Sequence, residues 1–251
     1  MQLVPPSPSL RPFFPYYGGK WRFARRYPSP RYRRIVEPFA GSAGYSVRYS
    51  AHRVELNDAF GAVVDTWTYL AGADPHQISA LPDILLDQTV DLVPLAARPL
   101  VGWWLNKAKN RPCRSPSAWM RAWLTDENEK ARRPVSYWGP GVRQRLAAQL
   151  GAIRHWQVSH GSYESLDTSQ PATWFIDPPY QRAGAHYPKG SQQIDFAHLA
   201  DWCRSLRGQI IVCENEGAEW LPFLGLGLSK ATHGHHRRGK SRECVFLANN
   251  P

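Results

Sequence analysis

Ile35-Val36-Glu37-Pro38-Phe39-Ala40-Gly41-Ser42-Ala43-Gly44 sets the topology that the sequence predicts. An apolar strand pattern at 35–39 gives way to small residues, and a helical pattern follows at 45–50. Small residues let a backbone approach a ligand closely, and the first turn of a helix presents free N–H groups. The segment predicts a ligand cradle at the end of a strand, although glycines used only for packing give the same pattern.

The same alternation of strand and helix patterns continues on both sides of this segment. Strand patterns recur at 53–56, 156–159, 173–176, 209–213 and 244–247, and helical patterns at 60–70 and 194–206. Strands that alternate with helices are typical of βαβ units, which build a mainly parallel sheet covered by helices. We therefore expect an α/β fold.

The middle of the chain differs in character from both ends. Strand patterns fade between 71 and 150, and the stretch 98–154 holds twelve Lys or Arg against three Asp or Glu, an excess of nine. We expect residues 1–70 and 151–251 to form two parts of one α/β domain. Residues 71–150 would then be a mostly helical insertion.

Composition limits the class of partner and the compartment. The 251 residues carry a net charge of +11, which favours a polyanionic partner, although scattered surface charge is the plainer alternative. The four cysteines lie far apart, as expected for reduced thiols in the cytoplasm and not for a zinc ribbon. We expect no secretory signal and no membrane segment. The proline-rich residues 1–11 predict an extended or mobile tail.

Two acidic residues follow predicted strands. Asp58 ends the second strand, where a carboxylate can accept hydrogen bonds from ribose hydroxyls or can cap the next helix. Phe175-Ile176-Asp177-Pro178-Pro179-Tyr180 runs an apolar strand into an acid, two prolines and an aromatic ring. The prolines stiffen this turn, so the Asp177 carboxylate and the Pro178 carbonyl can hold both N–H bonds of an exocyclic amine. Tyr180 offers a flat ring for stacking. An ordinary strand-ending turn is the alternative.

Together these motifs resemble the Dam-type DNA adenine-N6 methyltransferases, of the alpha group of amino-methyltransferases. Tyr16-Tyr17-Gly18-Gly19-Lys20 resembles their N-terminal aromatic-x-Gly-Gly-Lys motif, 37–42 their first cofactor loop, Asp58 their ribose-binding acid and 177–180 their catalytic tetrapeptide. The family often has Phe-x-Gly-x-Gly, where this chain has Ala43 as the last residue of the motif. The resemblance covers both ends of the chain and no residue of the middle.

The resemblance implies a Rossmann-like mixed seven-stranded sheet and a role for each matching residue. The catalytic residues would be Asp177, Pro178, Pro179 and Tyr180. S-adenosylmethionine would be bound by Tyr16, Lys20, Pro38, Phe39, Ala40, Gly41, Ser42, Asp58, Ser162, Tyr163 and Asp177. Tyr16 and Lys20 would contact the methionine portion of this cofactor. Ser162 and Tyr163 are placed only by their spacing from the catalytic strand, and a surface turn explains them equally well.

The resemblance also implies double-stranded DNA as partner, with the target adenine flipped out of the helix. Candidates for DNA contact in the basic, Trp-rich insertion are Lys107, Lys109, Arg111, Arg114, Arg132 and Arg133. Singly, each of these is more often a solvated surface charge, and the tryptophans are more often core residues. A second basic stretch runs from Arg22 to Arg34. The His-rich tract 233–240 predicts a basic loop between the last two strands, without a metal. We expect a monomer.

Two other classes of function stay open. Similar tetrapeptides occur in enzymes that methylate cytosine N4, RNA bases or glutamine side chains. A DNA-binding protein that has lost catalysis could retain the same scaffold, although the intact Lys20, Asp58 and tetrapeptide favour an enzyme.

Overall fold

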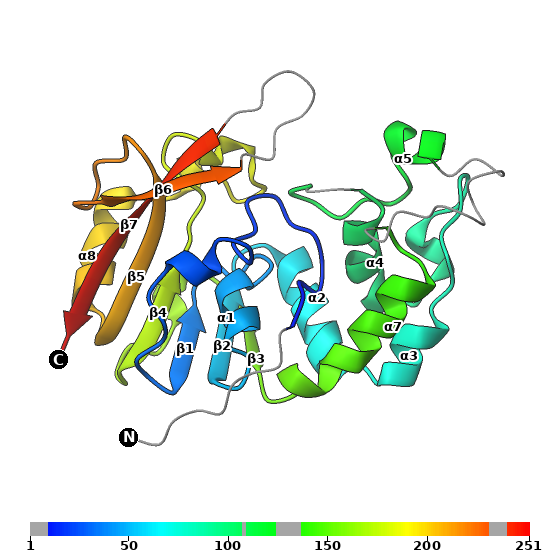
Figure 1. Ribbon diagram of the computed structural model, residues 1–251, viewed down its shortest axis with the longest axis horizontal. Coiled ribbons are helices and arrows are strands. Elements are labelled where there is room, and N and C mark those ends of the chain that lie inside the picture. Colours follow the sequence, from blue (N-terminus) through cyan, green and yellow to red (C-terminus); the bar gives the residue numbers. More distant parts are fainter. Residues whose placement is uncertain (1–9, 107–108, 124–136, 231–239) are drawn as a thin grey trace.

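The computed structural model describes residues 10–106, 109–123, 137–230 and 240–251. Within these residues the chain forms one seven-stranded sheet in the order β3-β2-β1-β4-β5-β7-β6 (Figure 1). Neighbouring strands pair in parallel from β3 to β5, and β7 runs antiparallel to both β5 and β6. The expected α/β class with a mixed, mostly parallel sheet is confirmed.

The strands closely follow the apolar patterns of the sequence. They are β1 (Arg34–Glu37), β2 (Arg53–Asp58), β3 (Gln157–His160), β4 (Ala172–Ile176), β5 (Gly208–Asn215), β6 (Leu224–Lys230) and β7 (Lys240–Asn250). No bounds were predicted for β6, whose leucines alternate with Gly225 and Gly227, and glycine has a low preference for strands. Strand β7 begins at Lys240, inside the tract predicted as a loop; residues 231–239 lie outside the described residues.

Helices cover both faces of the sheet and make up the middle segment. The α-helices are α1 (Gly44–Arg48), α2 (Gly61–Gly72), α3 (Pro75–Ala80), α4 (Arg98–Trp104), α5 (Ala118–Trp123), α7 (Pro140–Gln149) and α8 (Phe196–Ser205). Short 3-10 turns lie at η1 (Ala24–Arg26), η2 (Val90–Leu92), η3 (Leu95–Ala97), η4 (Leu150–Ile153), η5 (Tyr163–Ser165), η6 (Gly184–His186) and η7 (Ser191–Gln193). Helix α8 starts two residues after the predicted start because the Asp195 carboxylate caps it.

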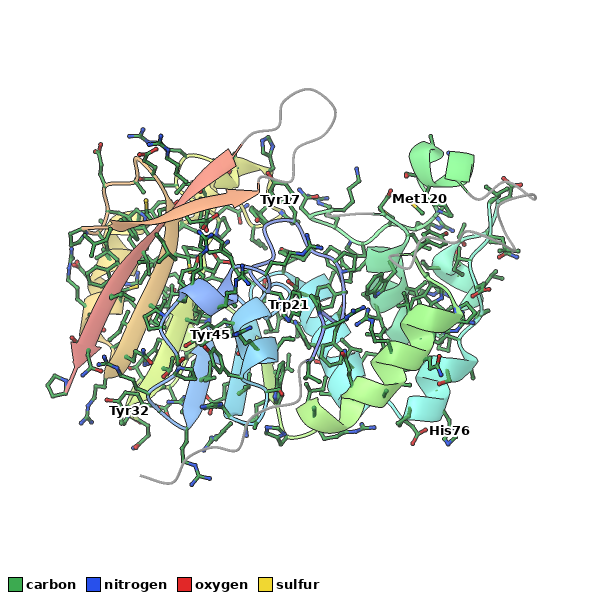
Figure 2. The ribbon with its side chains drawn as sticks, viewed as in Figure 1. Tyr17, Trp21, Tyr32, Tyr45, His76 and Met120 are labelled. Carbon is green, nitrogen blue, oxygen red and sulfur yellow. The ribbon has the colours of Figure 1, made fainter. Side chains whose placement is uncertain are left out.

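The central strand β4 is buried on both faces, as expected for a parallel strand between two helical layers. Phe175 packs on the face of α1, where its ring stacks on Tyr45 with centroids 4.4 Å apart. Trp174 points to the other face, into the cluster that contains residues of α8 such as Leu199. Figure 2 shows Tyr45 against the sheet, with Met120 and His76 at the far end of the middle segment.

The strand order fixes where a ligand would bind. It matches the 3-2-1-4-5-6 order of Rossmann folds, with β7 inserted between β5 and β6. The order reverses between β1 and β4. Ligands of open α/β sheets bind at such a switch point, outside the carboxyl ends of the strands.

The segment 71–150 contains helices and no strand within its described part. It packs on the sheet domain through Trp103, whose Nε1 donates to Thr66 Oγ1 at 2.9 Å, and Trp104, whose Nε1 donates to Phe13 O at 3.0 Å. These two tryptophans and Trp138 are buried, so they are core residues. The side chains of Trp119 and Trp123 lie outside the description.

The N-terminus departs from the extended tail expected for residues 1–11. Leu10 is buried, and its carbonyl accepts a hydrogen bond from Trp21 Nε1 at 3.0 Å. The Arg11 N–H donates to Gln149 at 2.8 Å. Because Leu10 and Arg11 are bonded to the folded domain, the predicted tail is wrong for these two residues; residues 1–9 lie outside the described residues. Among the described helices, none has the length and apolarity to cross a bilayer.

We expect Gly44→Ala to destabilise the protein by about 1–3 kcal/mol, because an added Cβ would lie 2.4 Å from the Trp21 amide nitrogen. Gly141→Ala in α7 is the matched control, since a Cβ there meets nothing within 4 Å and alanine favours helices. Urea unfolding of the three proteins measures both effects. Equal stability of Gly44→Ala and wild type would show that the backbone of residues 20–21 does not depend on this close approach.

Candidate active site

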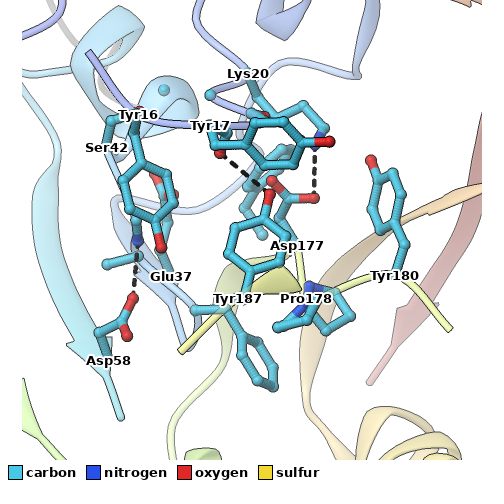
Figure 3. Close-up of a pocket in the computed structure, with 18 of the residues that line it drawn as sticks. Tyr16, Tyr17, Lys20, Glu37, Ser42, Asp58, Asp177, Pro178, Tyr180 and Tyr187 are labelled. Carbon is cyan, nitrogen blue, oxygen red and sulfur yellow. Dashed lines mark hydrogen bonds and ion pairs between the residues drawn. The ribbon is translucent and has the colours of Figure 1, made fainter. Parts of the chain in front are cut away.

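A pocket of about 1260 Å³ lies at the carboxyl ends of the parallel strands. Its lining includes the last residues of β1, β2 and β5, and the residues directly after β3 and β4. Lys20, Asp58 and Asp177 face it (Figure 3), and Gly41 also lines it. Four motifs that are far apart in the sequence are therefore brought together at one place.

The most buried charged contact of the pocket joins Lys20 to Asp177. The Lys20 ammonium lies 2.9 Å from Asp177 Oδ1, and the two side chains are 9% and 19% exposed. Burial acts to lower the pKa of Lys20, but the Asp177 carboxylate raises it overall, so Lys20 stays charged. The predicted contact of Lys20 with a cofactor carboxylate is not tested by this arrangement and stays a prediction.

Gly18 shapes the loop that delivers Lys20. Gly18 has a φ of +74°, and a Cβ there would lie 2.3 Å from the Tyr187 hydroxyl oxygen. That hydroxyl donates to Tyr17 O at 3.1 Å, so the loop is tied to the segment after the tetrapeptide. Lys20 Nζ also donates to Gly18 O at 3.1 Å, which holds the side chain against its own turn.

The tetrapeptide 177–180 is fixed by residues on both sides of it. The Tyr180 hydroxyl donates to Glu243 Oε2 of β7 at 2.6 Å, and the Lys20 ammonium lies 4.6 Å from the centre of the Tyr180 ring. The Gly184 amide donates to Tyr180 O at 2.6 Å. A Cβ at Gly184 would lie 2.5 Å from the Pro179 carbonyl carbon, so this tight turn requires glycine.

The predicted cradle after β1 forms around Gly41, at a φ of +45°. Its N–H donates to Asp58 Oδ2 at 2.9 Å, and Phe60 N–H donates to Asp58 Oδ1 at 2.9 Å. Burial raises the pKa of Asp58 to about 6, against these two backbone N–H bonds, which lower it. The Tyr16 ring lies directly against Gly41, where a Cβ would be 3.1 Å from Tyr16 Cε1.

Ala43, the departure from the family motif, has a φ of +46°, a left-handed conformation that favours glycine. Holding a non-glycine residue there costs about 1–2 kcal/mol. Ala43 is fully buried and precedes α1, so tertiary packing compensates for this strain. The cradle therefore forms with alanine at this position.

Asn57, next to Asp58, ties the loops of three strands together. Its side-chain amide donates to Pro38 O at 3.2 Å and to Gly161 O at 3.0 Å. Its Oδ1 accepts from Ser159 Oγ at 3.0 Å. This buried residue explains why the loops after β1, β2 and β3 line one wall of the pocket.

The remaining predicted cofactor residues also line this pocket: Pro38, Phe39, Ala40, Ser42, Ser162 and Tyr163. The Tyr163 and Phe39 rings have centroids 5.6 Å apart. The Tyr163 hydroxyl hydrogen-bonds His198 Nδ1 at 2.7 Å, so Tyr163 faces the pocket while its hydroxyl is bound to α8. Ser162 caps the turn η5 by accepting from Glu164 N–H.

The predicted DNA-binding residues have less structural support. Lys109 and Arg111 are exposed, and the Lys109 carbonyl accepts from Tyr17 N–H at 3.1 Å, which places this segment beside the Lys20 loop. Arg114 forms an ion pair with Asp91 at 2.6 Å. Lys107, Arg132 and Arg133 lie outside the described residues.

The lining residues without a predicted role include Glu37, Tyr187 and Glu243. Glu37 ends β1, and its Oε1 accepts from Ser46 N–H at 2.7 Å. Burial raises the pKa of Glu37 to about 8, although the hydrogen bonds of Ser46 lower it. The available signal was an acid inside an apolar strand run for Glu37 and directly before one for Glu243, because a buried carboxylate needs a partner. No local signal marked Tyr187.

Neither a scan against protein-family models nor a search of the curated proteins found a match for this chain. The geometry of the pocket and the motifs that line it therefore carry the functional argument.

We expect the contribution of Glu37 to stability to fall as pH rises from about 4.5 to 8, because the folded state keeps a proton on Glu37 that the unfolded state loses from its ordinary pKa of 4.5. Glu37→Gln should make the free energy of unfolding depend less on pH between pH 6.5 and 8. This range lies above the pKa of Asp58, so that Asp58 contributes little to the change. Urea unfolding at these two pH values measures it. Glu219→Gln, at an exposed carboxyl, should keep the wild-type slope. If the free energy of unfolding changed equally with pH in wild type and Glu37→Gln, this would contradict the assignment of the raised pKa to Glu37.

Proposed function

We propose that this protein is an S-adenosylmethionine-dependent DNA methyltransferase that modifies the exocyclic N6 of adenine. The observation that carries the proposal is the position of Asp177. It directly follows the central strand β4 at the switch point of the sheet, in the same pocket as Lys20, Gly41 and Asp58. A half-buried acid at this point suits a reaction in which an amine must be held.

The pocket lining fits the proposed cofactor. Gly41 brings the backbone and the Tyr16 ring into close contact, and Asp58 presents a carboxylate beside them for ribose hydroxyls. Lys20 has three N–H donors, and it donates to Gly18 O while it forms an ion pair with Asp177, so at least one donor is left for a carboxylate of the ligand. Phe39 and Tyr163 add aromatic surface for a base. When bound, this cofactor supplies a methyl group made electrophilic by a sulfonium.

The volume of the pocket favours a two-ligand reaction. At about 1260 Å³ it exceeds the roughly 300–1,000 Å³ of a pocket for one drug-sized molecule. A nucleoside cofactor and a flipped base are together a ligand of this size. Asp177 would accept N–H bonds of the adenine amine and orient its lone pair, and Tyr180 would offer its ring to the base. Flipping costs a few kcal/mol, and stacking offsets roughly 1–3 kcal/mol per base.

The direct test is transfer of labelled methyl groups to plasmid DNA, followed by mass analysis of the nucleosides. N6-methyladenine supports the proposal, N4-methylcytosine redirects it to the other amino-methyltransferases, and label in RNA alone removes DNA as substrate. Titration calorimetry with S-adenosylmethionine separates an enzyme from a DNA-binding protein without catalysis: absence of cofactor binding would contradict the proposal.

We expect Asp177→Ala to lower the rate of methyl transfer by at least about 10²-fold, because the amine loses the acid that orients it. Asp65→Ala, at an exposed site on α2, is the control and should keep wild-type activity. Circular dichroism checks folding. Since Asp177→Ala leaves Lys20 without its carboxylate, Asp177→Asn is a second variant of similar shape. Full activity in Asp177→Ala would rule this mechanism out.

We further expect cofactor affinity to fall as pH drops through about 6, because the ionised Asp58 is the acceptor for ribose hydroxyls. Losing a hydrogen bond to a charged group should cost about 1.5–3 kcal/mol, roughly 10- to 100-fold in affinity. Calorimetry between pH 5 and 7.5 measures the profile. Asp58→Asn should bind weakly with a flat profile; an unchanged pH dependence in this variant would assign the effect to another group.

A further inference from the structure

The charged residues that line the pocket differ in sign between its interior and its mouth. Those that are acidic lie inside, buried or half-buried: Glu37, Asp58, Asp177 and Glu243. Apart from the buried Lys20, the basic ones are exposed at the rim: Arg22, Arg25, Arg26 and Lys189. The pocket therefore has an acidic interior and a basic mouth.

The three rim arginines belong to one short turn, which directly follows Lys20. Phe23 N–H and Ala24 N–H both donate to Lys20 O, at 2.8 and 2.7 Å. Ala24 and Tyr27 are buried on the inner side of the turn, and the Tyr27 ring lies 5.1 Å from that of Phe175 in β4. The turn is thereby anchored to the strand that carries Asp177, with its arginines facing outward.

These arginines are not engaged by acidic neighbours. Within the described residues Arg22, Arg25 and Arg26 form no ion pair with a carboxylate, whereas Arg34, later in the same basic stretch, is paired with Glu55 at 2.6 Å. The guanidinium of Arg26 lies over the Phe23 ring at 4.8 Å. Exposed, unpaired guanidinium groups at a pocket mouth are available to an anionic ligand.

This separation of interior acidic residues from basic residues at the rim favours some kinds of ligand over others. A small free anion that entered the pocket would place its charge among the interior carboxylates, which repel it. A polynucleotide strand fits instead, because it can insert an uncharged base and keep its phosphates outside. We propose that Arg22, Arg25 and Arg26 bind backbone phosphates of the DNA strand whose base enters the pocket. This inference rests on the proposed function and adds a DNA contact outside the insertion.

A matched control lies in the same molecule. Arg33 comes just before β1, so it lies at the amino ends of the parallel strands, away from the pocket. The first turn of α1 is at the pocket, and Arg48 ends this helix on the side away from it. Both are exposed and neither lines the pocket. The double variant Arg33→Ala/Arg48→Ala therefore removes two positive charges, as many as Arg22→Ala/Arg25→Ala removes. Arg26 is kept in both variants, because it packs on Phe23.

The experiment measures binding of a fluorescent DNA duplex by anisotropy over a series of salt concentrations, with cofactor binding measured separately. Each lost phosphate contact should reduce the slope of log K against log salt by about 0.9. Arg22→Ala/Arg25→Ala should therefore lose about 2 from the slope and at least about tenfold in affinity near 0.1 M salt. The control should stay within about twofold, and cofactor affinity should be unchanged in both variants.

Equal losses in the two variants would show that only net charge matters and would overturn the rim contact. Unchanged DNA binding in Arg22→Ala/Arg25→Ala would overturn it as well. If the wild type methylates DNA while the rim variant binds normally, the rim inference fails and the proposed function stands. If the rim variant alone loses DNA affinity while the wild type transfers no methyl group, the rim contact stands and the proposed function fails.

Discussion

The ion pair between Lys20 and Asp177 is the contact on which the arrangement of the pocket depends. Two opposite charges taken out of water lose hydration, and their attraction compensates only when each has its partner in place. Removing one partner of such a pair typically costs about 3–5 kcal/mol. The N-terminal loop and the end of β4 are far apart in sequence, so this pair couples correct placement of the loop to correct placement of the tetrapeptide.

Close backbone contacts make this coupling possible, and they explain the glycines around it. The first turn of α1 must pass against the backbone of Lys20 and Trp21, which only Gly44 allows. Gly184 similarly lets its turn close on Pro179. The glycines thus serve packing whether or not a ligand binds beside them, so the two interpretations of a small-residue cradle are not exclusive. Ala43 shows that left-handed φ alone does not demand glycine when the surrounding packing holds the residue.

Local patterns were enough to predict the parallel strands, because a strand buried on both faces, such as β4, is a continuous apolar run. The site residues adjacent to strand ends followed from the same reasoning, since parallel strands end at one edge. What could not be predicted depends on contacts distant in sequence. The bond of Glu243 to Tyr180 requires the antiparallel insertion of β7, and the burial of Leu10 requires its contact with Trp21. The bounds of β6 were not predicted because its leucines alternate with Gly225 and Gly227, and glycine has a weak preference for strands.

One short segment links the interior of the pocket to its mouth. The turn that presents Lys20 to Asp177 continues directly into the rim arginines, and Ala24 and Tyr27 anchor both to the core. An acidic interior alone would repel a polyanion, whereas a basic rim alone would bind one without selecting a group for the interior. Because this turn holds the basic rim beside the acidic interior, the two together favour a ligand whose charged and uncharged parts are separated by a few ångströms. A nucleotide within a strand has that property, which a free phosphate and a free base each lack.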